Sequence, residues 1–118
     1  MENSLLDAQA QLILALQAGD ENSFQILYDS YSAVLFGIIY RIVADQDEAE
    51  NLLQDCFIKV WQNIARYDPE KGKLATWLFN IARNTAIDFK RSKYFNQKLK
   101  NQNIENLVGE HMDQAVTL

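Results

Sequence analysis

Apolar side chains recur at intervals of three and four residues along most of this chain, and this spacing restricts the fold more than any other feature. One face of an α-helix repeats at that interval, whereas a half-buried strand alternates at every second residue. Only four Gly and one Pro are present to interrupt such segments. We therefore predict an all-α fold, a compact bundle of about four helices around one core.

The pattern separates into segments at residues that end or begin helices. The expected helices cover about residues 4–18, 20–43, 48–66 and 74–93. Gly19 ends the first, and Asp20 is a candidate N-cap for the second. Asp47, with Glu50 three residues later, resembles a capping box that opens the third helix.

The last two helices each carry a stripe of residues that we expect in the core. The third helix contributes Ala49, Leu52, Leu53, Cys56, Phe57, Val60, Trp61 and Ile64. The fourth contributes Leu74, Trp77, Leu78, Ile81, Ala82, Thr85, Ala86 and Phe89. Both sets match the helical template closely.

The segment Tyr67–Lys73 is the clearest loop, since it holds the single Pro and a Gly. Beyond Lys93 the chain turns to Asn, Gln and Lys, and the periodicity weakens. We therefore expect a helical domain over residues 1–93, followed by a helical or disordered extension or linker over 94–118.

The charge is divided unevenly along the chain. Residues 1–70 carry three basic and twelve acidic side chains, 3 − 12 = −9, whereas residues 71–100 carry eight basic and one acidic, 8 − 1 = +7. Such a division suggests two faces for two partners, one of them polyanionic. A solvated basic helix is the plainer alternative.

Several classes of protein are disfavoured. The single Cys56 cannot form an internal disulfide and lies in an apolar stripe, while His111 has no apparent partner. No phosphate-binding Gly loop or calcium-loop spacing is present, so we expect no enzyme, no cofactor and no metal. No signal peptide is apparent, and the longest apolar runs are far shorter than a membrane span. We expect a cytoplasmic protein.

The outward face of the third helix carries an apolar residue among polar ones. At 100° per residue, Ile58 lies amid Asn51, Gln54, Asp55 and Gln62, opposite the core stripe. An apolar centre with a polar rim is typical of a protein interface, although a lone exposed Ile is also ordinary.

The outward face of the fourth helix combines cations, amides and apolar groups. It carries Phe79, Asn80, Arg83, Asn84, Ile87, Lys90 and Arg91. Arg and Lys contact phosphates, Asn pairs with base edges, and aromatic rings stack on bases. Phe79 and Ile87 could instead pack beneath another helix.

Three blocks in order carry a family resemblance: ALQAGDENSFQILYDSY, DQDEAENLLQDCFIKVW and WLFNIARNTAIDFKR. Together they resemble region 2 of bacterial RNA polymerase sigma factors, and most closely the extracytoplasmic-function group. The resemblance covers about residues 12–93.

The resemblance implies a transcription initiation factor domain with two binding faces. The helix that matches Asp47–Ile64 would dock on the clamp helices of the largest polymerase subunit, through Asn51, Gln54, Asp55, Ile58 and Gln62. The segment that matches Tyr67–Lys93 would bind the promoter −10 element, help to open it, and hold flipped bases of the non-template strand. The implied DNA-binding residues are Tyr67, Asp68, Lys71, Lys73, Trp77, Asn80, Arg83, Asn84, Lys90 and Arg91.

The sequence departs from the family in two places. Housekeeping members have a Trp pair for melting, whereas this chain has Trp77 followed by Leu78, with Leu74 near another aromatic position. This favours a stringent, specialised factor. Family members also continue into a second domain that reads the −35 element, so we expect an excised domain whose promoter affinity is weak.

Two other functions remain open from the sequence. The chain could be a helical interaction module, an anti-sigma target or an adaptor, without specific DNA binding. It could also be a small regulator that reads duplex DNA, although the seven-residue loop at 67–73 fits a helix-turn-helix poorly.

Overall fold

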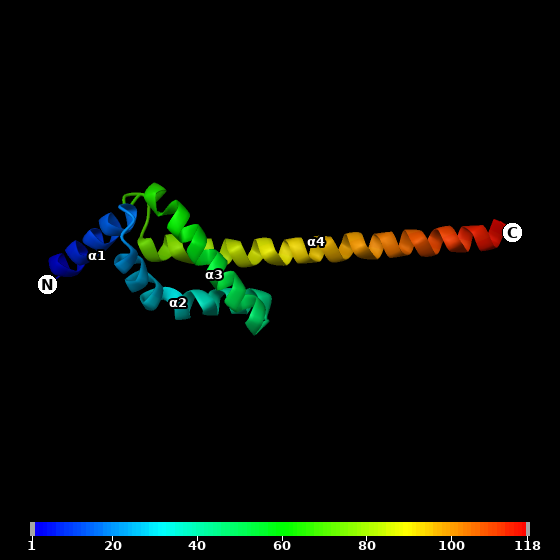
Figure 1. Ribbon diagram of the computed structural model, residues 1–118, viewed down its shortest axis with the longest axis horizontal. Coiled ribbons are helices and arrows are strands. Elements are labelled where there is room, and N and C mark those ends of the chain that lie inside the picture. The colour runs from blue at the N-terminus through cyan, green and yellow to red at the C-terminus, as the bar shows by residue number, and fades with distance from the viewer. Residues whose placement is uncertain (1, 118) are drawn as a thin grey trace. The chain divides into compact units, whose positions relative to one another are not determined.

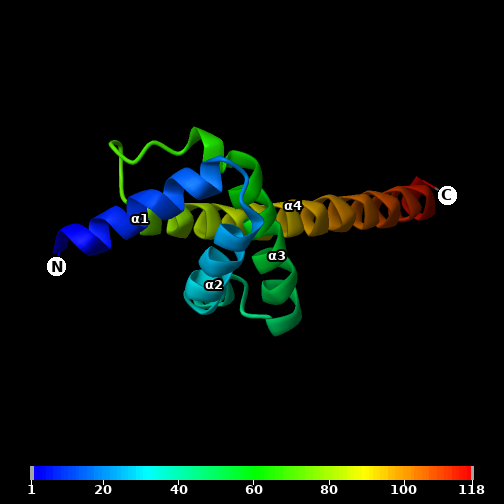
Figure 2. The ribbon, with the colours of Figure 1, turned by 60° about the vertical axis from the view of Figure 1, so that its left-hand side comes forward.

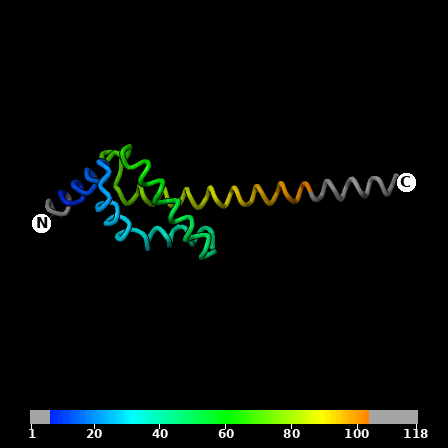
Figure 3. The backbone as a smooth tube through the Cα atoms, in the orientation of Figure 1, coloured from blue at the N-terminus to red at the C-terminus, as the bar shows by residue number. Residues whose placement is uncertain are grey.

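The computed structural model describes the backbone of residues 2–117 and the side chains of residues 7–103 (Figure 3). The side chain of His111 lies outside the described residues. The chain divides into two units, Met1–Ile87 and Asp88–Leu118. All of the described secondary structure is helical, which confirms the all-α prediction.

In the described backbone, four α-helices and one short 3-10 helix follow one another (Figure 1). Their bounds are Glu2–Gln17 for α1, Glu21–Val43 for α2, Gln46–Asn63 for α3, Ile64–Arg66 for η1, and Leu74–Thr117 for α4. Within the first unit α2 packs against α3, as both views show (Figure 2). Lys59 Nζ on α3 donates a hydrogen bond of 3.2 Å to Thr85 Oγ1 on α4.

The first unit is built around side chains from all four α-helices. The largest fully buried ones are Leu16, Leu27, Leu35, Ile39, Cys56, Val60, Leu74 and Leu78. Burial raises the pKa of the Cys56 thiol to about 11, which keeps it neutral near pH 7. The prediction that Cys56 packs in the core is confirmed.

The second helix, α2, is long and apolar enough to cross a membrane by length and composition. The core helices of globular proteins meet the same criterion, and Leu27, Leu35 and Ile39 of α2 are fully buried within the first unit. The sequence prediction considered the length of each apolar run, and these runs are short. The mean hydropathy of the whole helix is higher than the short runs indicated.

The N-cap of α2 is the predicted one, and that of α3 is not. Asp20 accepts a hydrogen bond of 2.9 Å from the Ser23 backbone N–H, as expected. At α3, Asp45 rather than Asp47 is the cap, and its Oδ1 accepts from the Glu48 N–H at 2.9 Å. Ala44 takes a left-handed conformation that ends α2, so α3 begins directly after it, and the predicted box of Asp47 and Glu50 is wrong.

One further prediction from periodicity is wrong. Trp61 is 39% exposed rather than part of the core, and its ring meets Phe24 edge to face at 5.0 Å between centroids. The last helix continues to Thr117, so the extension that was expected to be helical or disordered is helical. Residues 94–103 of it are all exposed, and a helix that buries no stripe carries a weak periodic signal.

The loop between η1 and α4 is held at both ends by side chains. Gln17 Nε2 on α1 donates to the backbone carbonyls of Ile64, at 3.1 Å, and Tyr67, at 2.7 Å. The Tyr67 hydroxyl donates to the carbonyl of Gly72 at 2.7 Å, which closes the loop across its width. The loop therefore has a defined position against α1 and the start of α4.

Because Asp45 is the N-cap of α3 and Asp47 is not, replacing each of them by Ala should lower the free energy of unfolding by different amounts. Asp45→Ala should lower the free energy of unfolding by about 1 kcal/mol, since the Glu48 N–H loses its acceptor. Asp47→Ala should cost only about 0.3 kcal/mol, through the helix dipole. Urea denaturation of the two variants measures both values. A larger loss at Asp47 would contradict the assignment.

The loop closure predicts a cost for removing one hydroxyl. Tyr67→Phe keeps the ring but leaves the Gly72 carbonyl without its donor, and should destabilise the chain by about 0.5–1.5 kcal/mol. Tyr40→Phe is the matched control, because Tyr40 is exposed and should tolerate the change. Equal urea midpoints for both variants would show that the hydroxyl does not close the loop.

Candidate functional site

The loop at residues 67–73 is shaped by its own backbone and by Asp68. Asp68 Oδ1 accepts a hydrogen bond of 2.9 Å from the Glu70 N–H, and its carbonyl accepts one of 3.1 Å from the Lys71 N–H. These two bonds form a tight turn around Pro69. They direct Lys71 and Lys73 to the surface, where both are exposed.

A pocket of 280 Å³ lies between this loop and the first turns of α4. It is lined by Arg66, Tyr67, Asp68, Lys71, Gly72, Lys73, Thr76, Trp77 and Asn80. Its volume is close to the lower end for pockets that hold a small organic group, about 300 Å³. Three cations against one carboxylate favour an anionic ligand.

Six of the predicted DNA-binding residues line this one pocket: Tyr67, Asp68, Lys71, Lys73, Trp77 and Asn80. Trp77, which was expected in the core, is half-buried, and Asn80 is exposed. An aromatic ring, an amide and three cations together can offer stacking, pairing to a base edge, and phosphate neutralisation.

Tyr67 is the most buried of the predicted DNA-binding residues. Its side chain is only 6% exposed and packs against the Trp77 ring at 5.2 Å between centroids. Burial is the main cause that raises the pKa of Tyr67, and the charges of Asp68 and Tyr31 raise it further, so the hydroxyl stays protonated as a donor. These contacts tie Tyr67 to the loop and to Trp77, while its DNA contact stays a prediction.

The remaining predicted DNA-binding residues lie outside the pocket. Arg83 and Asn84 are exposed on α4 in the first unit. Lys90 and Arg91 are exposed in the second unit. Arg66 also lines the pocket and was not predicted from the sequence. Its position directly before the loop could have indicated that it lies beside Lys71 and Lys73.

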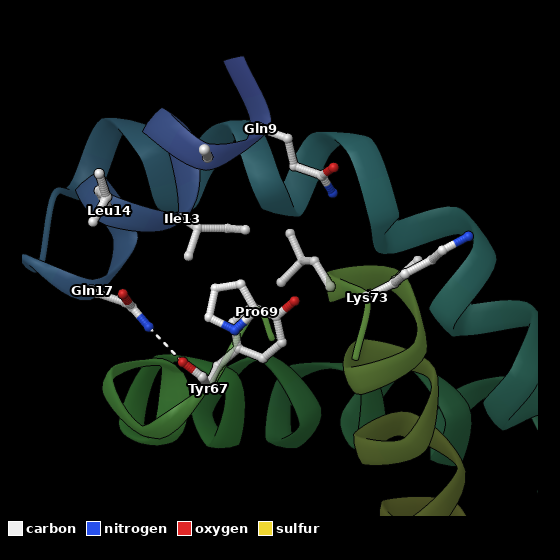
Figure 4. Close-up of a pocket in the computed structure, with 10 residues that line it drawn as sticks. Gln9, Ile13, Leu14, Gln17, Tyr67, Pro69 and Lys73 are labelled. Atoms are coloured by element: carbon white, nitrogen blue, oxygen red, sulfur yellow. Dashed lines mark hydrogen bonds between the residues drawn. The ribbon is translucent and has the colours of Figure 1, made fainter. Parts of the chain in front are cut away.

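A second hollow of 660 Å³ lies on the side of the loop that faces α1 (Figure 4). Ile13 and Leu14 of α1 line it together with Pro69, while Tyr67 and Lys73 line both hollows. Figure 4 shows the hydrogen bond from Gln17 to the Tyr67 carbonyl beside it. The position of the loop therefore determines the shape of both hollows.

The outward face of α3 is arranged as the helical wheel predicted. All five candidate polymerase-binding residues are exposed: Asn51, Gln54, Asp55, Ile58 and Gln62. Ile58 has 54% of its surface exposed. These side chains form one face with an apolar centre.

A groove of 590 Å³ between α2 and α3 adjoins this face. Gln54, Ile58 and Gln62 line one side of it, and the rest of its lining is Glu21, Phe24, Gln25, Tyr28, Phe57 and Trp61. The rings of Phe57 and Tyr28 lie 4.6 Å apart, and those of Phe24 and Phe57 6.0 Å apart. Sequence reasoning missed Phe24, Tyr28 and Trp61 here, because their spacing matched a core stripe.

In the described part of the chain, no three His, Cys, Asp or Glu side chains gather so that they could hold a metal ion. One of the two faces is cationic with a pocket, and the other is aromatic with a polar rim.

Comparison with known proteins places the chain in a family. The family model of Sigma-70 region 2 matches residues 27–95. The ECF RNA polymerase sigma factor SigK of Mycolicibacterium vanbaalenii is 36% identical over 74 residues, which are 63% of this chain and 38% of the relative. SigW of Bacillus subtilis, also an ECF RNA polymerase sigma factor, is 35% identical over 81 residues, 69% of this chain and 43% of the relative. The chain thus spans about two fifths of the length of these relatives.

A solved structure is similar as well. The NMR structure of an engineered region 2 of sigmaE, in complex with GTAAAA, superposes with a TM-score of 0.64 at 28% identity. The likeness covers 70% of this chain and 84% of that one. The chain therefore belongs to the sigma-70 region 2 family, and the relatives that it matches are extracytoplasmic-function sigma factors.

Proposed function

We propose that this chain is the promoter-recognition domain of a transcription initiation factor. It binds the non-template strand of the −10 element at the loop and at α4, and the clamp helices of RNA polymerase at α3. The pocket of 280 Å³ beside the loop carries this proposal, because it joins cations, an aromatic ring and an amide in one place. The similar region 2 of sigmaE, which was solved with GTAAAA, supports it.

The pocket receives one base flipped out of the stack. Flipping costs a few kcal/mol, so the pocket must return that free energy through contacts with the extruded base. Trp77 offers the exposed part of its ring for stacking, and Asn80 offers an amide that pairs with base edges. The rigid loop prepares the pocket in advance, which lowers the entropy cost of binding.

The cations around the pocket hold the sugar-phosphate chain. Arg66, Lys71 and Lys73 line the opening. Arg83, Asn84, Lys90 and Arg91 are further exposed contacts on α4. Asp68 shapes the turn rather than contacting phosphate, since like charges repel.

The domain has a limited ability to open the DNA duplex, because it lacks two of the aromatic residues that housekeeping members use for this. Leu78 stands where housekeeping members have the second Trp, and Leu74 stands near another aromatic position. Both leucines are fully buried in the core of the first unit. Trp77 therefore stacks without a Trp neighbour, and the factor opens only promoters whose −10 element fits its pocket well.

Polymerase binds at the outward face of α3, with Ile58 at its centre. A well-packed apolar residue surrounded by polar groups is the usual arrangement of an interface hot spot. The aromatic groove beside it extends the apolar area toward α2. The catalytic work of transcription remains in the polymerase, so this domain acts in the cytoplasm as a positioning factor.

An interaction module without specific DNA binding is the second candidate. The aromatic groove between α2 and α3 favours it, because a protein helix could fill that groove whether or not DNA is bound. An anti-sigma factor is such a partner. The two functions differ in whether the base pocket discriminates among sequences.

Selection from single strands with randomised positions, of the length of GTAAAA, tests the DNA function. The full chain should enrich one motif, and Asn80→Ala should lose about 1–3 kcal/mol of affinity for it while still binding scrambled strands. Asn51→Ala on α3 is the matched control. An unenriched pool, or equal losses for both variants, would reduce the DNA binding to charge alone.

Capture of RNA polymerase core enzyme tests the protein interface. Ile58→Ala combined with Asp55→Lys should weaken capture by more than about 1 kcal/mol, as expected for a hot spot. Ile26→Ala combined with Asp29→Lys is the matched control, since Ile26 on α2 is also 54% exposed. Similar capture by both double variants would exclude α3 as the docking face.

A further inference from the structure

The end of α1 is held in place by its own backbone and by the core of the first unit. Gly19 takes the left-handed conformation that commonly follows a helix, with a φ of +85°. Its N–H donates to the Leu16 carbonyl, and the Asp20 N–H donates to the Ala15 carbonyl, both at 3.0 Å. The Leu16 side chain is only 1% exposed. Gln17, the last residue of α1, therefore has a defined position.

The side-chain amide of Gln17 bonds two carbonyl groups at η1. Its Nε2 lies 3.1 Å from the carbonyl oxygen of Ile64, the first residue of η1, and 2.7 Å from that of Tyr67, which follows η1 (Figure 4). Carbonyl groups at a helix end need donors from outside the helix. A Gln amide has two N–H groups, one for each carbonyl. Gln17 therefore fixes the point at which the loop leaves η1.

Tyr67 connects Gln17 to the base pocket. The Tyr67 hydroxyl donates to the Gly72 carbonyl at 2.7 Å, and its ring lies 5.2 Å from the Trp77 ring between centroids. Tyr67 lines the pocket of 280 Å³, and it also lines the hollow toward α1, as Gln17 does. A change at Gln17 is thus one residue away from the loop closure and from the aromatic ring of the pocket.

The family match assigns no part in this arrangement to Gln17. The match covers residues 27–95, and the pocket is lined by residues between 66 and 80, all within it. Gln17 lies before the match and is not among the residues that line the pocket. Its effect on the pocket is therefore exerted through Tyr67.

We propose that Gln17 is a positioning residue that determines how well the pocket discriminates among bases. This inference rests on the proposed function. Without the Gln17 amide, the loop takes up positions in which Trp77 and Asn80 no longer meet the same base, so only a fraction of the molecules is ready to bind. The apparent affinity for the preferred strand falls by that fraction. Phosphate contacts of Lys71 and Lys73 tolerate a displaced loop, because they depend on charge at the end of long side chains.

A purely structural role for Gln17 is the alternative. In that case the loss of its hydrogen bonds lowers the fraction of folded chain, and binding to every strand falls by the same factor. A positioning role lowers binding to the preferred strand more than binding to other strands. The ratio of the two affinities therefore distinguishes the two roles.

Gln17→Met provides the test, because Met is unbranched and of similar length but has no N–H to donate. Gln9→Met is the matched control, since Gln9 is exposed on α1 and lines the same hollow. Fluorescence anisotropy with the full chain compares the strand enriched by motif selection with a scrambled strand of equal length. Gln17→Met should weaken binding to the enriched strand about tenfold. It should leave binding to the scrambled strand and the salt slope unchanged, because no charge is removed. Gln9→Met should bind both strands as the wild type does.

Hydrogen exchange of the loop amides supplies a readout that needs no DNA. The Tyr67 N–H donates to the Ile64 carbonyl and the Lys71 N–H to the Asp68 carbonyl, both at 3.1 Å. Both amides should exchange faster in Gln17→Met than in the wild type, since the loop opens more often. The amides of α3 should keep their exchange rates, which checks that the first unit remains folded.

The outcomes separate this inference from the proposed function. Equal losses of affinity for both strands, or full discrimination by Gln17→Met, would overturn the inference while motif selection still succeeds. Unchanged exchange of the two loop amides would overturn it as well. A wild-type chain without any strand preference would instead remove the proposed function, and the selectivity assigned to Gln17 with it.

Discussion

One amide nitrogen on α1 holds the loop on which the candidate site depends. Gln17 donates hydrogen bonds to the carbonyls of Ile64 and Tyr67, and the Tyr67 hydroxyl then closes the loop onto Gly72. Tyr67 and Lys73 line the hollows on both sides of the loop. A shift of the loop would therefore change both hollows, so the first helix helps to set the shape of the candidate site through Gln17.

Two surfaces of the first unit differ in charge and in shape. The acidic half, with a charge of −9 over residues 1–70, contains the aromatic groove and the face around Ile58. The rest of the first unit, residues 71–87, carries three basic and no acidic side chains, 3 − 0 = +3. An acidic surface repels a polyanion and a basic surface attracts one, so the charge division favours different partners for the two surfaces.

Periodicity predicted the helices correctly, because the burial of one helical face is a local pattern. It could not predict features that depend on backbone conformation or distant contacts. The left-handed Ala44 places the α3 cap at Asp45, and the Tyr67 carbonyl is bonded by Gln17, fifty residues away. Trp61 matched the core stripe, yet its ring lies at the surface against α2. Most of the pocket was predictable as a group of residues, but not as a cavity.

Intermolecular NOEs between the chain and its preferred single strand test the central claim most directly. One base should give NOEs to side-chain protons of Thr76, Trp77 and Asn80 and should lose its NOEs to neighbouring bases, as expected for a base extruded into the pocket. NOEs confined to Lys and Arg side chains, with all bases still stacked, would contradict the account and leave only an electrostatic contact.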